Sequence, residues 1–366
     1  MKNYTKDELA LILLDSYEGL EYKHKSAVIS LYKNVGDLFE DPRKFIDYVK
    51  ENVGEGESLT VKGSLNGKDY LNYLIKNLAD RNILAITCLS EYYPSIFANL
   101  PSKPLIIYAK GNIKLLNATK TFGIVGSRKT LPFVLKAGEN IAKELSSNGI
   151  VIISGSAVGG DRCALLGALE SGNVISILAS GHDFVSPQSN RDLVQKIAQK
   201  GLVISEYPPS VCSAPWRFPM RNRLISALSN SVLFLSGQME SGTRYTAKFA
   251  EAYSKTMYAI PYSLGEKSGE ICNLLIKLGK AQLVENAEDI AEAENIVLKE
   301  EIEVDLEDDE IEILSAMEGS MHVDQIALNL GKKTYEIIPI LSMLEIKGVV
   351  AKGANNTYTA IIKIKQ

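Results

Sequence analysis

Glycine, serine and arginine gather at the ends of short apolar runs, where they could bind an anion. In "TFGIVGSRK", at 121–129, an apolar run ends in Gly126, Ser127, Arg128 and Lys129. Turns of this kind expose backbone N–H groups, and arginine adds a guanidinium, so the combination suits phosphate. Comparable turns follow later apolar runs, in "SGSAVGGD" (154–161), "ASGHD" (179–183) and "ESGTRYTA" (240–247). Because parallel strands end at one edge of a sheet, these turns are expected to form one anion site.

A second basic stretch, "RFPMRNRLISALS" at 217–229, narrows the choice of anion. If Phe218 and Pro219 open a helix, Arg221 and Arg223 fall in its first turn. The helix macrodipole disfavours cations there, so a negative group should compensate them.

Two interpretations of these arginines remain open. They form internal salt bridges, for example to Glu206 or Asp161, or they join Arg128 around several phosphates. The second is favoured, because guanidiniums beside turns rich in N–H groups suit successive phosphates better than one carboxylate. This predicts a polynucleotide backbone as the ligand.

Cofactor and metal sites are not expected. The sequence has no GxxxxGK[ST], and "GSAVGG" lacks the GxGxxG spacing of a dinucleotide fold. The three histidines are solitary, and the cysteines lie far apart without a CxxC pair: Cys88, Cys163, Cys212 and Cys272.

The elements that must position the anion site follow from the pattern of apolar runs. From residue 121 onward, six short runs alternate with segments of helical length. They are "FGIVG", "IVIIS", "VISILA", "GLVISE", "SVLFLS" and "TMYAIP". This βαβ rhythm predicts a parallel, doubly wound sheet, hence an α/β fold. Helical periods dominate residues 1 to 100, and three helical periods followed by two short strands near the C-terminus predict a winged helix.

Charge and composition set the wider class. The chain of 366 residues has a net charge of −4 and no run of eighteen apolar residues, and its N-terminus is polar, so a cytoplasmic protein without membrane segments is expected. The charge is uneven: residues 105–229 hold fourteen Lys and Arg against seven Asp and Glu, whereas 300–312 has no basic residue. Charge alone does not distinguish a binding site from a solvated face.

These motifs resemble those of the DNA processing protein A (DprA, Smf) family. The supporting stretches are "GIVGSRK", "SGSAVGGD", "SGHDFVSPQSNR", "ISEYPP", "FPMRNRLISALS", "SGTRYTA" and "CNLLIKLGKAQLV". They fall in the family's order and spacing and are strongest from about 105 to 285. "SEYPP" followed by "FPMRNR" is the most specific pair.

The resemblance implies an extended Rossmann-like core that binds single-stranded DNA, forms homodimers and loads the RecA recombinase onto DNA taken up during natural transformation. It divides the chain into an N-terminal helical (SAM-like) domain (1–100), the core (101–298), an acidic linker (299–308) and a winged-helix domain (309–366). It places the DNA pocket on Ser127, Arg128, Ser154, Gly155, Asn190, Arg191, Arg221, Asn222, Arg223, Ser241, Gly242 and Thr243. The strand-end motif adds Gly126 and Lys129.

This chain departs from the family pattern at four positions. Val158 stands in place of an arginine, Leu165 of a histidine, Ser186 of a tyrosine and Ser236 of an acidic residue. The change at Val158 removes one possible phosphate contact.

An enzyme or sensor of a nucleotide-derived ligand is the rival hypothesis. Its acid or base candidates are Asp161, Asp183, Glu206 and His182, but Thr246 stands where related hydrolases place a glutamate. Binding without catalysis is therefore favoured.

Two further points concern the DNA contact. The expected recognition helix of the winged helix, at 332–348, carries Glu336 and Glu345, which suit a protein partner better than a major groove. Of the aromatic residues near the pocket loops, Trp216 or Phe218 is expected to stack on an unpaired base.

Overall fold

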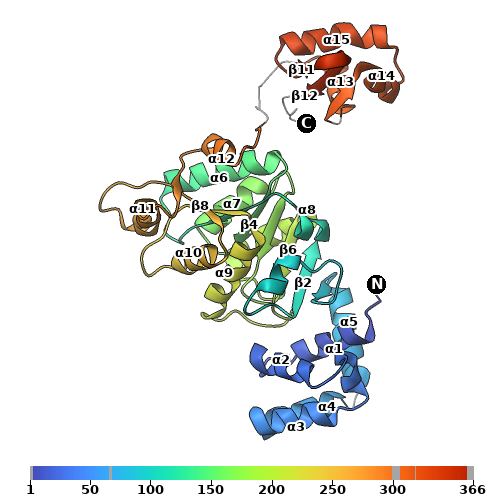
Figure 1. Cartoon of the computed structure of the whole chain (residues 1–366), viewed down its shortest axis with the longest axis vertical. Helices are drawn as coiled ribbons and strands as arrows, with labels where there is room; N and C mark the ends of the chain where they lie inside the picture. Colours follow the sequence, from blue (N-terminus) through green and yellow to red (C-terminus); the bar gives the residue numbers. More distant parts are fainter. Residues whose placement is uncertain (1–2, 66–67, 299–305, 318, 361–366) are drawn as a thin grey trace. The chain divides into compact units, whose positions relative to one another are not determined.

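The structure, a computed structural model, describes residues 3–65, 68–298, 306–317 and 319–360. The chain divides into two compact units, residues 1–290 and 291–366 (Figure 1). The four segments expected from the sequence stay a prediction, and most of the acidic linker lies outside the described residues.

A nine-stranded sheet forms the centre of the first unit, with the order β1-β2-β6-β5-β4-β3-β7-β8-β9. Seven strands from β6 to β9 are parallel, while β2 runs antiparallel to β6 and β1 antiparallel to β2. The strands are β1 (Leu84–Thr87), β2 (Ile106–Gly111), β3 (Thr121–Val125), β4 (Val151–Gly155), β5 (Val174–Ile177), β6 (Leu202–Ser205), β7 (Ser231–Phe234), β8 (Thr256–Ala259) and β9 (Gln282–Leu283). The predicted α/β fold class is confirmed, and each of the six apolar runs overlaps one of the strands β3 to β8.

Helices connect the parallel strands and cover both faces of the sheet. They are α6 (Pro132–Ser147), α7 (Gly160–Ala168), α8 (Arg191–Lys200), α9 (Arg217–Leu228), α10 (Thr243–Ala252) and α11 (Glu270–Lys277), and α12 (Ala287–Ala293) follows β9. The helix α6 packs on α7, and α9 packs on α10. The two pairs lie on opposite faces, as right-handed crossovers in opposite directions along the sheet require (Figure 1).

The direction of winding changes at β3. From β3 the chain proceeds through β4, β5 and β6 on one side, and it then returns to β7 on the other side of β3. Loops that leave β3 and β7 therefore diverge and open a crevice at the carboxyl ends of these strands. This topology sets where a ligand site can form.

Five helices precede the sheet: α1 (Lys6–Asp15), α2 (Tyr22–Ser30), α3 (Arg43–Asn52), α4 (Glu55–Leu65) and α5 (Lys68–Asp80). Thr5 caps α1 in a capping box with Glu8, which satisfies two free amides at the helix start. The helix α4 forms although it contains two glycines, Gly56 and Gly63. Its Ser58 and Val61 are buried against the neighbouring helices, and this packing outweighs the low helix propensity of its glycines.

Polar contacts join these helices to the sheet. The Tyr108 hydroxyl on β2 donates to Asp15 on α1 at 2.9 Å, and Lys25 forms an ion pair with the same carboxylate at 2.9 Å. Arg81, just after α5, pairs with Asp183 at 3.0 Å. The helices thus share a polar and apolar interface with the sheet within one compact unit.

The second unit contains α13 (Asp308–Ser315), α14 (Val323–Leu330) and α15 (Thr334–Ile346), with a sheet of order β10-β12-β11. Its strands are β10 (Ser320–His322), β11 (Val350–Lys352) and β12 (Thr357–Ala360). The predicted helices and the hairpin are present, and β10 adds a third strand that the sequence analysis did not predict. The winged-helix assignment stays a prediction.

In the part of the chain that the structure describes, no helix combines the length and apolarity needed to cross a bilayer. The same residues contain no group of three His, Cys, Asp or Glu side chains that could hold a metal ion. The four cysteines are free thiols.

Candidate functional site

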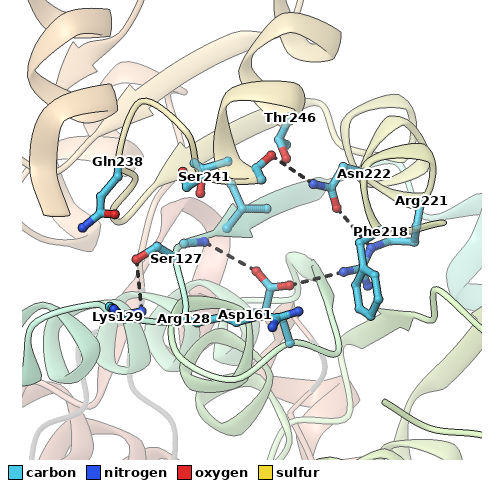
Figure 2. A pocket seen from close by; sticks show the side chains of 15 residues that line it. Ser127, Arg128, Lys129, Asp161, Phe218, Arg221, Asn222, Gln238, Ser241 and Thr246 are labelled. Carbon is cyan, nitrogen blue, oxygen red and sulfur yellow. Dashed lines mark hydrogen bonds and ion pairs between the residues drawn. The ribbon is translucent and has the colours of Figure 1, made fainter. Parts of the chain in front are cut away.

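A cavity of about 310 Å³ lies at the crevice between the loops that follow β3 and β7 (Figure 2). The residues that line it come from the end of β3, from these two loops, from the start of α7 and the loop before it, from α9 and from the first turn of α10. They are Val125, Gly126, Ser127, Arg128, Lys129, Ala157, Asp161, Phe218, Arg221, Asn222, Gln238, Ser241, Gly242, Thr243 and Thr246. The cavity therefore occupies the position that the topology of the sheet favours for a ligand.

The loop after β3 is held close to α7 by two facing glycines. A Cβ atom on Gly160 would lie 2.4 Å from the Cα atom of Gly126, a distance at which the two backbones could not stay in place. The Ser127 amide donates to the Ser236 hydroxyl at 2.8 Å. Ser236, where the family pattern has an acidic residue, thus fixes this loop without adding a negative charge.

Arg128 and Lys129 carry the exposed positive charge of the cavity. The Arg128 guanidinium lies 5.6 Å from the centre of the Phe218 ring, within cation–π distance. A guanidinium beside an aromatic face can bind a phosphate while the ring contacts a base.

The opposite wall supplies hydroxyl groups without protein partners. Among the described residues, the buried hydroxyls of Ser241 and Thr246 have no hydrogen-bond partner. Both residues line the cavity, and Thr243 begins α10 there. Free hydroxyls at a helix start are suited to anionic oxygens.

Arg221 lies at the base of the cavity, and it is not in the first turn of its helix, as the sequence had indicated. It is 2% exposed, forms an ion pair with Asp161 at 3.5 Å and donates to the Ile177 carbonyl. Burial raises the pKa of the Asp161 carboxyl. The Arg221 charge and the Gly126 amide, 3.5 Å away, oppose part of that rise. The helix begins at Arg217, so Arg221 is in its second turn and has internal partners, as in the salt-bridge interpretation.

Arg223 does not line this cavity, contrary to the prediction. It is 4% exposed and pairs with Glu206, which follows β6. Burial raises the pKa of the Glu206 carboxyl, and the Arg223 guanidinium opposes that rise. Arg223 lies two residues after Arg221 on α9, so its side chain points to another face of the helix. The three predicted arginines therefore do not form one cluster.

Four other predicted residues also lie outside the lining of the cavity. Ser154 is buried and donates to the Ile124 carbonyl at 2.6 Å, and the space above Gly155 is filled by the Asp161 and Arg221 side chains.

The other two lie near the start of α8. Asn190 is buried, donates to the Ser156 carbonyl at 2.8 Å and accepts from Arg162 at 2.6 Å. Arg191 is exposed at the first position of α8. Asn190 is therefore a loop-fixing residue in this structure.

The nine remaining predicted residues are brought together around the cavity: Gly126, Ser127, Arg128, Lys129, Arg221, Asn222, Ser241, Gly242 and Thr243. The predicted contacts did not include Val125, Ala157, Asp161, Gln238 and Thr246, and Phe218 was named only as one of two candidates for base stacking. Phe218 lies three residues before Arg221 and four before Asn222. This helical spacing was the available signal that Phe218 shares their face of α9.

Comparison with known proteins identifies the family. The pattern of DNA recombination-mediator protein A matches residues 64–295. The chain is 32% identical to DNA processing protein DprA of Bacillus subtilis over 214 residues, which are 58% of this chain and 72% of that protein. Another relative is DNA processing protein DprA of Streptococcus pneumoniae, 32% identical over 56% of this chain and 72% of that protein.

Solved structures agree with this assignment. DNA processing protein A from Streptococcus pneumoniae superposes with a TM-score of 0.65 at 27% identity, covering 80% of this chain and 98% of that one. DNA processing protein A from Helicobacter pylori, solved to describe its single-stranded DNA binding mode, gives 0.54 at 31% identity over 58% and 95%. This chain belongs to the DNA recombination-mediator protein A family.

Proposed function

We propose that this chain binds single-stranded DNA through the β3–β7 cavity, protects incoming strands and loads RecA recombinase onto them during natural transformation. The observation that carries the proposal is the cavity itself, where Arg128 and Lys129 are exposed and face hydroxyls that lack hydrogen-bond partners among the residues that the structure describes. Such a surface can follow the phosphates of a flexible strand. The H. pylori relative, whose structure describes single-stranded DNA binding, supports the same ligand here.

Single-stranded DNA is expected to bind far more tightly than a duplex of the same sequence. The cavity is a crevice of loops and helix starts, so it fits an extended backbone rather than a rigid double helix. Affinity should fall steeply with salt, because each neutralised phosphate releases counterions. Gel-shift titrations of both ligands across salt concentrations measure this, and equal affinity for the duplex would contradict the proposal.

Arg128→Ala is expected to weaken single-stranded DNA binding and to leave folding intact. Arg128 is exposed and contacts Phe218, so its loss removes a phosphate contact without leaving a buried charge unpaired. The slope of log affinity against log salt should decrease by about one unit for the lost contact.

The exposed Arg43 on α3 offers a matched control, and Arg43→Ala should change neither quantity. An unchanged salt slope for Arg128→Ala would remove this residue from the interface.

A homodimer is part of the proposal, and the structure offers an apolar surface for it. Met239 and Leu264 line a shallow cavity of about 380 Å³ beside α11 and are 47% and 101% exposed. Leu278, after α11, is 56% exposed. Exposed apolar side chains that gather in this way indicate a protein interface.

Light scattering should give the mass of two chains, and Leu264→Arg should give the mass of one. The control Leu59→Arg changes a leucine that is 60% exposed on α4 and should stay dimeric. Since two linked pockets raise apparent affinity, the Leu264→Arg variant should also bind long strands more weakly. A wild-type monomer with full DNA affinity would refute the dimer.

The RecA part of the proposal is tested separately. RecA should assemble on an oligonucleotide faster when wild-type protein is already bound than when the Arg128→Ala variant is supplied. No acceleration by the wild-type protein, with strand binding intact, would restrict the function to binding and protection.

We also propose that the protein is not an enzyme. The rival hypothesis needs acid and base groups in one site, but only Asp161 of its four candidates lines the β3–β7 cavity. Glu206 pairs with Arg223, Asp183 pairs with Arg81, and His182 binds the Tyr108 carbonyl at 2.9 Å. Incubation with labelled nucleotides and oligonucleotides tests this, and turnover would favour the rival.

A further inference from the structure

A second cavity, of about 440 Å³, lies on the other side of α9, between the N-terminal helices and the sheet, and we call it the outer cavity. Its walls come from α1 and α2, from the loop after β6 and from the first two turns of α9. The volume is within the range of about 300–1,000 Å³ that small ligands occupy. All of these elements belong to one compact unit.

The helix α9 separates the two cavities and contributes side chains to both. Phe218, Arg221 and Asn222 line the β3–β7 cavity. The outer cavity is lined by other positions of the same turns: Trp216, Arg217, Met220 and Arg223. With about 3.6 residues per turn, these sets lie on opposite sides of the helix. About 10 Å, the diameter of a helix with its side chains, therefore separates the two cavities.

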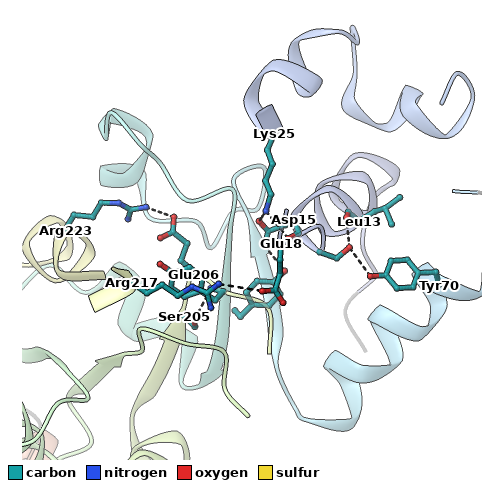
Figure 3. A network of polar contacts seen from close by, with 12 residues as sticks. Leu13, Asp15, Glu18, Lys25, Tyr70, Ser205, Glu206, Arg217 and Arg223 are labelled. Atoms are coloured by element: carbon teal, nitrogen blue, oxygen red, sulfur yellow. Dashed lines mark hydrogen bonds and ion pairs between the residues drawn. The ribbon is translucent and has the colours of Figure 1, made fainter. Parts of the chain in front are cut away.

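Buried donors in the outer cavity lack partners. Arg223 lines it, has a side chain that is 4% exposed, and uses one nitrogen to bind Glu206 (Figure 3). Among the described residues, its Nε and Nη1 atoms have no hydrogen-bond partner, and neither does the Nε of Arg217. Buried donors of this kind require an acceptor, so the cavity is suited to a ligand with carbonyl or ring-nitrogen acceptors.

An aromatic wall stands beside these donors. Trp216 is 59% exposed and meets Tyr207 edge to face, with ring centres 6.4 Å apart. The Arg217 guanidinium lies 4.7 Å from the Tyr207 ring centre and 5.0 Å from that of Trp216. Flat rings and a flat guanidinium are the groups on which unpaired bases stack.

The charges of the outer cavity disfavour a phosphate. Four carboxylates line it together with three cations: Asp15, Glu18, Glu21 and Glu206 against Lys25, Arg217 and Arg223. Figure 3 shows Arg223 directed at Glu206, Arg217 at Glu18 and Lys25 at Asp15. A nucleobase is neutral and carries both donors and acceptors, so it fits a cavity that offers both.

We propose that the outer cavity takes an unpaired base of the strand whose phosphates lie in the β3–β7 cavity, with Trp216 as the stacking surface and Arg223 as a hydrogen-bond donor. This inference rests on the proposed single-stranded DNA binding and extends it. It assigns the N-terminal helices a part in DNA binding, because α1 and α2 form one wall of the base site.

Trp216 is the single tryptophan of the chain, so its fluorescence reports on this site alone. The probe is an oligothymidylate of about 16 nucleotides, compared with an abasic strand of the same length and phosphate count. The oligothymidylate should quench the fluorescence to saturation. The abasic strand should bind, as shown by the anisotropy of an end label, without quenching.

Trp216→Ala should weaken oligothymidylate binding by about 5- to 150-fold, the range expected for one lost base stack, and leave abasic-strand affinity unchanged. Trp216→Phe should restore most of the loss. The control Tyr335→Ala, at an aromatic residue that is 66% exposed in the second unit, should have no effect.

Equal losses on both strands, or no loss on either, would overturn the base site. Quenching by thymidine monophosphate at the same total base concentration would also overturn it, since the cavity would then take free nucleotides. Failure of the wild-type protein to bind either strand would instead refute the proposed function, so the two failures are distinguishable.

Discussion

Arg221→Ala is expected to lower the free energy of unfolding by about 3–5 kcal/mol, the usual cost of breaking a buried ion pair from one side. The change leaves Asp161 as a buried carboxylate, 6% exposed, whose Arg221 partner at 3.5 Å is gone. It also removes the donor to the Ile177 carbonyl. Urea unfolding of the variant measures the loss, and DNA affinity should fall with it because the base of the cavity is disrupted.

Neutralising the partner should recover part of this loss. In Asp161→Asn/Arg221→Ala no uncompensated charge remains, so the double variant should lose less stability than the two single variants together. Arg128→Ala provides the contrast, with weaker binding and an unchanged unfolding curve. If Arg221→Ala kept full stability and lost only DNA binding, the guanidinium would be a phosphate ligand instead of a structural partner of Asp161.

Gly160→Ala is expected to displace the loop that carries Arg128. The new Cβ atom would meet the Cα and N atoms of Gly126 at 2.4 and 2.8 Å, so the loop or the start of α7 must move. Backbone cannot yield as a flexible side chain does, and overpacking of this kind costs about 1–3 kcal/mol or more. Binding of single-stranded DNA should weaken by about tenfold or more, equivalent to about 1.4 kcal/mol.

Gly63→Ala, on α4 and outside the cavity, is the control. A Cβ atom there would meet nothing within 4 Å, and no left-handed backbone conformation prevents an alanine. Unfolding and titration of both variants decide the question. Equal, small effects at the two glycines would show that the contact between α7 and the loop after β3 does not position the site.

The parallel strands and the loops at their carboxyl ends followed from local patterns. Short apolar runs separated by segments of helical length specify parallel strands, because a strand buried on both faces is apolar throughout. The glycines and serines after β3 and β7 indicated the edge of the cavity, because they form tight turns with exposed N–H groups directly after a strand. By contrast, β9, with only Gln282 and Leu283, is too short and too exposed to leave a recognisable apolar run.

The sequence by itself determined the fold class, the family and the strand-end loops, since these depend on periodicity and on residues adjacent in the chain. Only the tertiary structure decided which arginines face the β3–β7 cavity without a carboxylate partner. Arg128, Arg221 and Arg223 all looked like phosphate ligands, but Asp161 and Glu206, distant in sequence, pair with Arg221 and Arg223. A charge pattern cannot reveal such pairings, because the partner of a guanidinium depends on which side chains the fold brings within a few ångströms of it.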